Sequence, residues 1–193
     1  MEDNVFGVFR SDNAKIVYKQ ILNIDEVISL NDCLTQNINN NLTITNRGTS
    51  LVPGIRKHID IDLKTSNHKY LCDRLNVVLS DYFPDITIDP NVRLYNQPYG
   101  SVKPHIDKSH DSKSNYAMLI YLTDNFNDGK LSIKIKRTPD EMVQYKNNEH
   151  DKIFTFRPMR GYGIIFDKNL LHYASEVYDN NKNFLLIHFY SCF

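Results

Sequence analysis

Cysteine is scarce in this chain, and its spacing excludes two classes of small-domain scaffold. The three cysteines are Cys33, Cys72 and Cys192, and no two of them have the Cys-x-x-Cys spacing of a zinc knuckle. The odd count and wide separation also argue against a disulfide framework. The simplest interpretation is three reduced thiols in a reducing compartment, which predicts a cytoplasmic or nuclear protein.

Long apolar segments and an excess of one charge are also missing. The sequence contains no run of about 18 apolar residues, so no transmembrane helix is expected. The acidic start, Met1-Glu2-Asp3-Asn4, leads into no apolar segment, so no secretory signal is expected. Lys plus Arg number 23 and Asp plus Glu number 23, which gives no electrostatic reason to favour nucleic acid or an anionic membrane as a partner.

What is present fits one globular domain with two differently patterned parts. The chain has 193 residues, of which 41% are hydrophobic, enough to bury a core without metal or disulfide support. Residues 1–90 mix short strands with helices. One helix is expected from Asp25 to about Gln36, with Ile28, Leu30 and Leu34 inward and a loop over residues 37–41. A second is expected over His68–Tyr82, capped by Asn67.

Residues 91–193 are patterned as a β-sheet protein. Short apolar runs alternate with turns, and Asn127-Asp128-Gly129 has the composition of a hairpin turn. Two runs, 117–122 and 184–189, are apolar at nearly every position, so both of their faces should be covered. The prediction is a mainly β fold, a jelly-roll (double-stranded β-helix) core over 91–193 buttressed by the N-terminal helices. The runs are 92–95, 117–122, 131–135, 153–156, 161–166 and 184–190.

His105-Ile106-Asp107 is the first signal with a chemical meaning. Residues i and i+2 of an extended strand point to the same side, so the imidazole and the carboxylate can reach one metal ion. His-x-Asp alone is a weak signal, but His172 follows a later apolar run and can return to the same barrel mouth. Two histidines and one carboxylate make the facial triad that binds Fe(II) and leaves positions open for substrates.

A second pair of residues has the chemistry to bind a carboxylate. Lys182 comes ten positions after His172, just before the last apolar run, and Tyr121 comes sixteen positions after His105. An ammonium and a phenol at the inner end of a pocket can bind a carboxylate group together.

Four elements in order make residues 92–190 resemble the prolyl-hydroxylase branch of the 2-oxoglutarate- and Fe(II)-dependent dioxygenases. The first is a Tyr, a turn that contains Gly, then Pro-His-x-Asp, found here from Tyr95 through Pro104-His105-Ile106-Asp107. The second is Tyr121-Leu122 followed by an acidic turn with Asp128-Gly129. The third is Pro158-Met159-Arg160-Gly161, an apolar strand and His172. The fourth is a basic residue before the final strand, here Lys182.

The resemblance implies a role for each matching residue. His105, Asp107 and His172 would ligate Fe(II), Lys182 would pair with the distal carboxylate of 2-oxoglutarate beside Tyr121, and Tyr95 would touch the cosubstrate. It further implies O2 as oxidant, ascorbate as an accessory reductant, and hydroxylation of a protein or peptide substrate, proline first, with succinate and CO2 as co-products.

Other interpretations remain open at this stage. Lys182 and Tyr121 are also ordinary as a solvated lysine and a core aromatic, and His110 and His188 are more typical of a loop and a strand interior than of ligands. The long polar stretch 137–152 is either a connection or a substrate lid. Rival functions are a dioxygenase-like binding module without turnover, a small-molecule oxygenase and a nucleic-acid oxygenase. Pro98-Tyr99 and Asp128–Ser132 depart from the collagen-type pattern, which bears on the substrate.

Overall fold

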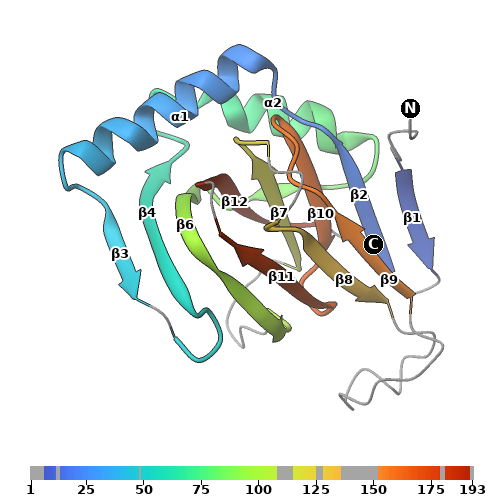
Figure 1. The fold of residues 1–193 in the computed structure, drawn as a ribbon. Helices are drawn as coiled ribbons and strands as arrows, with labels where there is room; N and C mark the ends of the chain where they lie inside the picture. Colours follow the sequence, from blue (N-terminus) through green and yellow to red (C-terminus); the bar gives the residue numbers. More distant parts are fainter. Residues whose placement is uncertain are drawn as a thin grey trace.

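The computed structural model describes residues 7–11, 14–47, 49–107, 115–124, 128–135, 152–178 and 181–191. Helices α1 and α2 lie across one side of a strongly curled antiparallel sheet (Figure 1). The elements in chain order are β1 Gly7–Ser11, β2 Ala14–Gln20, α1 Ile24–Asn39, β3 Ile44–Arg47, β4 Gly54–Asp62, α2 Tyr70–Ser80, β5 Thr87–Ile88, β6 Asn91–His105, β7 Tyr116–Tyr121, β8 Leu131–Ile135, β9 Lys152–Phe156, β10 Tyr162–Asp167, β11 Leu171–Val177 and β12 Lys182–Tyr190.

The sheet folds back on itself at β6, which belongs to two layers. Its first half pairs with β12 and β4, and its second half pairs with β11. One layer therefore runs β1-β2-β10-β7-β12-β6-β4-β3, and the other runs β6-β11-β8-β9. This arrangement is the predicted jelly roll, and the mainly β fold class with helical support is confirmed.

Both faces of the larger layer are apolar, and each face packs against a different part of the protein. In β12, Leu185, Ile187 and Phe189 face the helices, whereas Phe184 faces the space between the two layers. In β7 the same alternation puts Met118 on the helix side. Strand side chains alternate with a period of two, so a run that is apolar throughout must be covered on both sides, as the sequence predicted.

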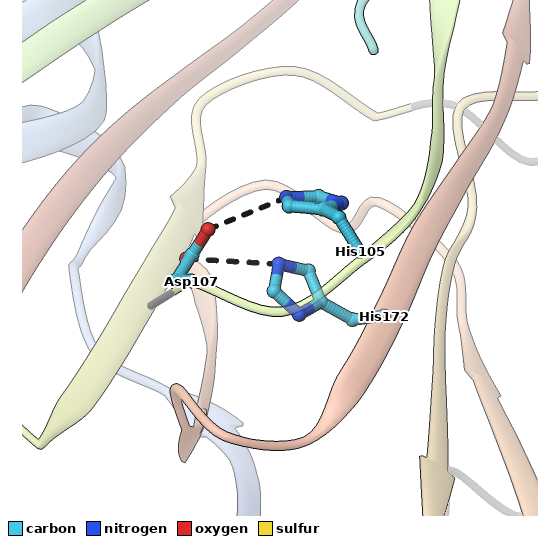
Figure 2. Close-up of side chains that lie close together, drawn as sticks. All are labelled: His105, Asp107 and His172. Atoms are coloured by element: carbon cyan, nitrogen blue, oxygen red, sulfur yellow. Dashed lines mark ion pairs between the residues drawn. The ribbon is translucent and has the colours of Figure 1, made fainter. Parts of the chain in front are cut away.

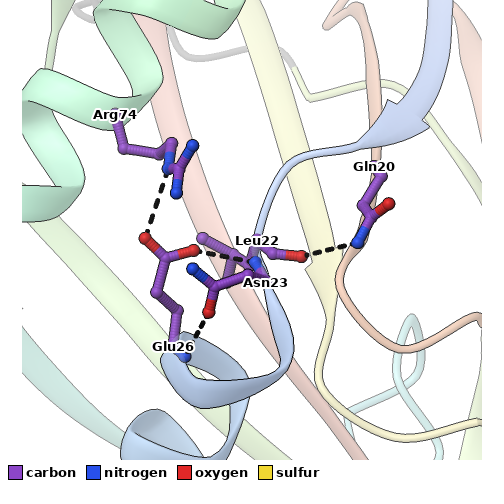
Figure 3. A network of polar contacts seen from close by, with 5 residues as sticks. All are labelled: Gln20, Leu22, Asn23, Glu26 and Arg74. Atoms are coloured by element: carbon purple, nitrogen blue, oxygen red, sulfur yellow. Dashed lines mark hydrogen bonds and ion pairs between the residues drawn. The ribbon is translucent and has the colours of Figure 1, made fainter.

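Helix α1 begins with a capping box that also ties it to α2 (Figure 3). The Asn23 side chain accepts from the Glu26 amide at 2.9 Å, and the Asn23 amide donates to Glu26 Oε2 at 2.8 Å. Arg74 of α2 donates from Nε to Glu26 Oε1 at 3.2 Å, so one carboxylate joins both helices. Gln20 donates to the Leu22 carbonyl just before the cap.

Three details predicted for the helices are wrong. Val27, Leu30 and Leu34 form the buried stripe of α1, while Ile28 is 50% exposed because it lies one residue, or 100°, around the helix from Val27. The loop was predicted to begin at residue 37, but α1 continues to Asn39. Helix α2 begins at Tyr70 with Lys69 at the cap position and no side-chain cap, so Asn67 does not cap it. Neither described helix is long and apolar enough to cross a membrane.

Two strand-level predictions also fail. The expected Gly-containing turn after Tyr95 is absent, because β6 runs unbroken from Asn91 to His105. The expected hairpin at residues 127–129 is wrong as well, since β7 pairs with β10 and β12 while β8 pairs with β9 and β11. The connection therefore crosses from one layer to the other. Strands β2 and β4 extend the core sheet, and the division of the chain at residue 90 stays a prediction.

Candidate metal centre

Two histidines and an aspartate converge at the end of β6 (Figure 2). His105 is the last residue of β6, and its Cα partner across the sheet is His172 of β11. Asp107 follows two residues later, so its carboxylate returns to the same side. His105 Nε2 lies 3.3 Å from Asp107 Oδ1, and His172 Nε2 lies 3.6 Å from Asp107 Oδ2. One ligand atom from each residue falls within 4.8 Å of the other two.

Backbone carbonyls fix how both imidazoles are protonated. His105 Nδ1 lies 2.8 Å from the Lys103 carbonyl and His172 Nδ1 lies 2.9 Å from the Leu170 carbonyl. A carbonyl can only accept, so each Nδ1 carries the proton and donates it. In the neutral ring the lone pair then sits on Nε2, the atom that faces Asp107. Metal-binding histidines are typically oriented in this way.

The charges of the three groups are coupled. Burial lowers the pKa of His105, but its hydrogen bond to Asp107 and the Lys103 carbonyl outweigh burial and raise it overall. Burial raises the pKa of Asp107, but the hydrogen bond from His105 and the charge of His172 lower it overall. The pKa of His172 is lowered, chiefly by burial. Asp107 is therefore ionised at neutral pH, and a bound cation would replace the proton that protonated His105 shares with it.

These donors fit a divalent transition metal. Two neutral imidazole nitrogens and one carboxylate oxygen suit Fe(II), and ligands at about 2.1 Å from one ion lie about 3 Å apart, which needs only small movements here. The three donors approach from two adjacent strands, so the opposite side of the ion stays open to other ligands.

The cluster opens into a cavity of about 120 Å³ inside the jelly roll. The cavity walls come from both layers, and they combine the three candidate ligands, two cations and apolar side chains. Its lining consists of Arg56, Val102, His105, Asp107, Leu119, Leu131, His172, Tyr173, Ala174, Lys182, Phe184 and Leu186.

Lys182 is buried in this cavity and is not a surface lysine. It begins β12 with 1% of its surface exposed, and its Nζ donates to the Gly129 carbonyl at 2.8 Å. Burial, with Arg56 adding repulsion, lowers the pKa of Lys182 to about 7. A buried ammonium with a single backbone acceptor has unused donors for an anion.

The Tyr121 ring lies close to Lys182. Lys182 Nζ lies 5.4 Å from the centre of the Tyr121 ring, and the Tyr121 side chain is fully buried. Its hydroxyl has no hydrogen-bond partner among the described residues, and burial raises its pKa. An unpaired buried hydroxyl is uncommon, because it loses its water without compensation. Because the Tyr121 ring is near the Lys182 ammonium, one ligand group that accepts from both is a hypothesis for this hydroxyl.

Neither Tyr95 nor Tyr121 is among the residues that line the cavity, so of the three predicted cosubstrate residues Lys182 alone lines it. The Tyr95 ring stacks on Phe184 with centroids 4.9 Å apart. Tyr95 thus supports a cavity wall from behind. Of the other histidines, His188 is outside the metal cluster, and His110, His150 and the stretch 137–151 lie outside the described residues.

Arg56 lines the cavity and is not anticipated by the sequence analysis. It comes from β4, whose sequence alternates apolar residues, Ile55, Ile59 and Ile61, with polar ones. That alternation would have predicted a strand with Arg56 on the opposite face from the isoleucines. The pairing of β4 with β6, which aims this face at the cavity, has no local signal in the sequence.

Comparison with known proteins supports the fold. No family model matches the chain, and no curated protein sequence matches it. Among solved structures, a prolyl-4-hydroxylase of Pseudomonas putida has 13% identity and a TM-score of 0.62, covering 92% of this chain and 93% of its own. A Trichoplax adhaerens prolyl hydroxylase, solved with a hypoxia-inducible-factor peptide fragment, has 15% identity, a TM-score of 0.67 and coverage of 94% and 84%.

A third similar structure is that of a protein described as an epimerase. It is the epimerase SnoN of nogalamycin biosynthesis, solved with Fe³⁺, α-ketoglutarate and nogalamycin RO, with 11% identity, a TM-score of 0.68 and coverage of 91% and 78%. The resemblance seen in the sequence is thus confirmed for the fold, which is that of the 2-oxoglutarate- and Fe(II)-dependent oxygenases.

Proposed function

We propose that this chain is an Fe(II)- and 2-oxoglutarate-dependent oxygenase that hydroxylates a C–H bond of a peptidyl residue, proline first. The observation that carries the proposal is the cavity that holds the His105, Asp107 and His172 cluster together with the buried Lys182. A metal cluster and a buried cation in one enclosed space match a cosubstrate that has a chelating end and a carboxylate end.

The three clustered side chains would hold Fe(II), which when bound supplies the redox chemistry that couples decarboxylation of 2-oxoglutarate to hydroxylation by O2. Lys182 would donate to the distal carboxylate and Tyr121 would donate its hydroxyl to the same group. The Lys103 and Leu170 carbonyls hold the proton of each neutral ring on Nδ1, so both Nε2 atoms would be free to bind the ion. The apolar side chains Leu119, Leu131 and Leu186 exclude water from this space, which protects reactive species from side reactions.

A peptide substrate is favoured by the similarity to the two prolyl hydroxylases, one of which was solved with a peptide. The similarity to SnoN supports a second candidate function, a small-molecule oxygenase, because its fold matches equally well. We rank the peptide first because the four ordered motifs found in the sequence are those of prolyl hydroxylases.

Succinate formation from 2-oxoglutarate with Fe(II), ascorbate and O2 tests the proposal without a known substrate, since these enzymes turn over slowly uncoupled. We expect succinate from the wild type, none from His105→Ala, and a strongly raised 2-oxoglutarate requirement for Lys182→Met. Calorimetry of Mn(II) and 2-oxoglutarate binding on the same samples separates a missing substrate from a missing site.

Matched controls come from the same chain. His68 is a buried histidine outside the cavity, so His68→Gln should keep succinate formation. Lys15 is a buried lysine whose Nζ donates to the Tyr82 carbonyl, so Lys15→Met tests the loss of a buried ammonium elsewhere. Absence of both metal and 2-oxoglutarate binding in the wild type would favour the binding module without turnover.

A further inference from the structure

The cavity contains a second cation that the proposed reaction does not use. Arg56 reaches the cavity from β4, while Lys182 reaches it from β12, on the other side of β6. Lys182 is fully enclosed, whereas Arg56 is only partly buried and keeps access to solvent. The two cations are close enough for each to disfavour the other's charge, and Arg56 contributes to the lowered pKa of Lys182.

The Arg56 side chain is held in a defined orientation. Its Nε donates to Gln97 Oε1 at 3.1 Å, and Gln97, which is fully buried, donates from Nε2 to the Gly100 carbonyl at 2.7 Å. Because that carbonyl accepts only, the Gln97 amide is fixed with its oxygen toward Arg56. The guanidinium also lies over the rings of Tyr95 and Phe184, 5.8 and 5.6 Å from their centres.

This support uses one donor of the guanidinium and leaves its terminal amino groups for other partners. Among the residues that the structure describes, no carboxylate lies within 4.0 Å of Arg56. An arginine fixed through Nε and stacked on aromatic rings presents its remaining N–H groups as a fork, the geometry that binds a carboxylate through two hydrogen bonds.

The sum of charges in the site with metal and 2-oxoglutarate bound points to the source of that carboxylate. The charges of a divalent metal and of Lys182 are matched by Asp107 and the two carboxylates of 2-oxoglutarate. Asp128 also acts on the charge of Lys182, but it forms no ion pair with Arg56, which is left without a paired carboxylate in a confined, partly desolvated place; this is unfavourable. The distal carboxylate already has Lys182 and Tyr121 at the enclosed end, so the more accessible Arg56 is available to another molecule.

We infer that Arg56 binds a carboxylate of the substrate that is oxidised, so that the substrate class is anionic, with an acidic group close to the reacting C–H bond. The inference rests on the proposed function, and it adds the charge of the substrate. Gln97 acts as a positioning residue that orients the guanidinium.

The test reads Arg56 directly, by NMR of arginine Nε–H groups in the Zn(II)- and 2-oxoglutarate-saturated protein at low ionic strength. The Arg56 signal is assigned by its loss in Arg56→Gln. Arg74, whose Nε also donates to a side-chain oxygen but lies on α2, provides the internal reference. Acetate is the probe and acetamide, of equal size and no charge, is its control.

We expect acetate to shift the Arg56 signal saturably, acetamide to leave it in place, and the Arg74 signal to respond to neither. An Arg56 signal that acetate does not move would overturn the inference. Calorimetry at pH 6, where Lys182 is largely protonated with or without Arg56, distinguishes the two carboxylate sources. There Arg56→Gln should change the Kd for 2-oxoglutarate by less than about threefold, while Lys182→Met weakens it by about tenfold or more. Equal weakening in both variants would assign Arg56 to the cosubstrate and overturn the inference.

Failure of the proposed function would look different from failure of this inference. If Zn(II) and 2-oxoglutarate do not bind the wild type, the metal centre is refuted. The acetate titration of Arg56 still reports on the guanidinium in the unloaded protein, where a response in Lys182→Met as well as in wild type supports an anion site at Arg56 itself. Loss of the response in Lys182→Met counts against it.

Discussion

At the scale of single residues, Lys182, which lines the cavity, and Tyr121, whose ring lies beside Lys182, have incomplete sets of hydrogen-bond partners. The Tyr121 hydroxyl is buried without a partner, and the Lys182 ammonium has one backbone acceptor. Both arrangements lower the free energy of unfolding of the empty protein, because the loss of water from these groups is not fully offset by hydrogen bonds. A bound carboxylate would compensate both, so stability and binding should respond in opposite directions to changes here.

Tyr121→Phe should therefore stabilise the empty protein while weakening cosubstrate binding. Removing an unpaired buried hydroxyl is expected to raise the free energy of unfolding by about 1 kcal/mol. The same change should weaken 2-oxoglutarate binding by about tenfold or more, since one hydrogen bond from a neutral hydroxyl to a charged carboxylate is lost. Urea unfolding and calorimetry measure the two effects, and a destabilised variant with unchanged Kd would identify Tyr121 as core only.

The lowered pKa of Lys182 makes cosubstrate binding depend on pH. The free site has a pKa of about 7, and a bound carboxylate raises it, so binding takes up a proton above pH 7. In metal-saturated protein, affinity for 2-oxoglutarate should be constant below pH 7. It should fall by up to about tenfold per pH unit as pH rises above 7, until the raised pKa of the complex is reached.

Lys182→Met provides the control for this pH dependence, because it keeps an unbranched stem and removes the charge. Its affinity should be low and nearly independent of pH over the same range in calorimetry. An equal slope in wild type and variant would place the titrating group elsewhere.

At the scale of secondary structure, β6 shows why one strand can serve two layers. Gly100 has φ of +104° and Gly54, its partner on β4, has φ of +121°. A Cβ on Gly100 would lie 2.2 Å from the Pro53 carbonyl oxygen, so the two backbones approach more closely than any side chain allows. The pair sits where β6 leaves the larger layer and begins to pair with β11.

Gly100→Ala should destabilise the fold by at least about 2 kcal/mol, since it combines an unfavourable φ with a backbone clash. Ser101→Ala, one residue further along the same strand, should change stability by less than about 0.5 kcal/mol. Urea midpoints of the two variants measure the difference. Equal midpoints would mean that the strand relaxes around the added methyl group.

The pattern of apolar and polar residues within a segment predicted most of the strands. It could not predict which strands pair with each other. The apolar runs that became β7 and β12 were evident because both faces are buried. Their partners depend on contacts between residues far apart in sequence, so the hairpin predicted at 127–129 is wrong. Arg56 was missed for the same reason. Its strand can be recognised in the sequence, but the sequence does not show that the polar face of that strand points at the cavity.

At the scale of the whole molecule, the candidate ligands join two strands that lie far apart in the chain. His105 and His172 are cross-strand partners, so a metal would link β6 to β11 and bind only the folded state. At a metal concentration of about 100 times Kd, the folded state should gain about 2.7 kcal/mol.

Thermal unfolding with Mn(II), with and without EDTA, measures this gain. His105→Ala should show none, and His68→Gln should show the wild-type response. A metal-dependent shift that persists in His105→Ala would indicate a different binding site.

Motif order predicted that His105, Asp107, His172 and Lys182 would come together, because each motif is short and its chemistry depends on residue type. These four residues do line one cavity, whereas Tyr121 does not, and its contact with the cosubstrate stays a prediction. Tyr95 was expected to contact the cosubstrate, but its ring stacks on Phe184. The motif gives the position of Tyr95 in the chain and does not show which side chain lies between it and the cavity. The metal and cosubstrate roles stay predictions until the binding experiments are done.

The position of β12 has a consequence for how the protein is synthesised. This strand lies between β6 and β7 in the middle of the larger layer, and it carries Lys182. Until it emerges from the ribosome, β6 and β7 each have an unpaired edge and the helices cover an incomplete apolar surface. A nascent chain that has not yet been extended to Tyr190 therefore exposes unpaired strand edges and apolar surface, which favours aggregation.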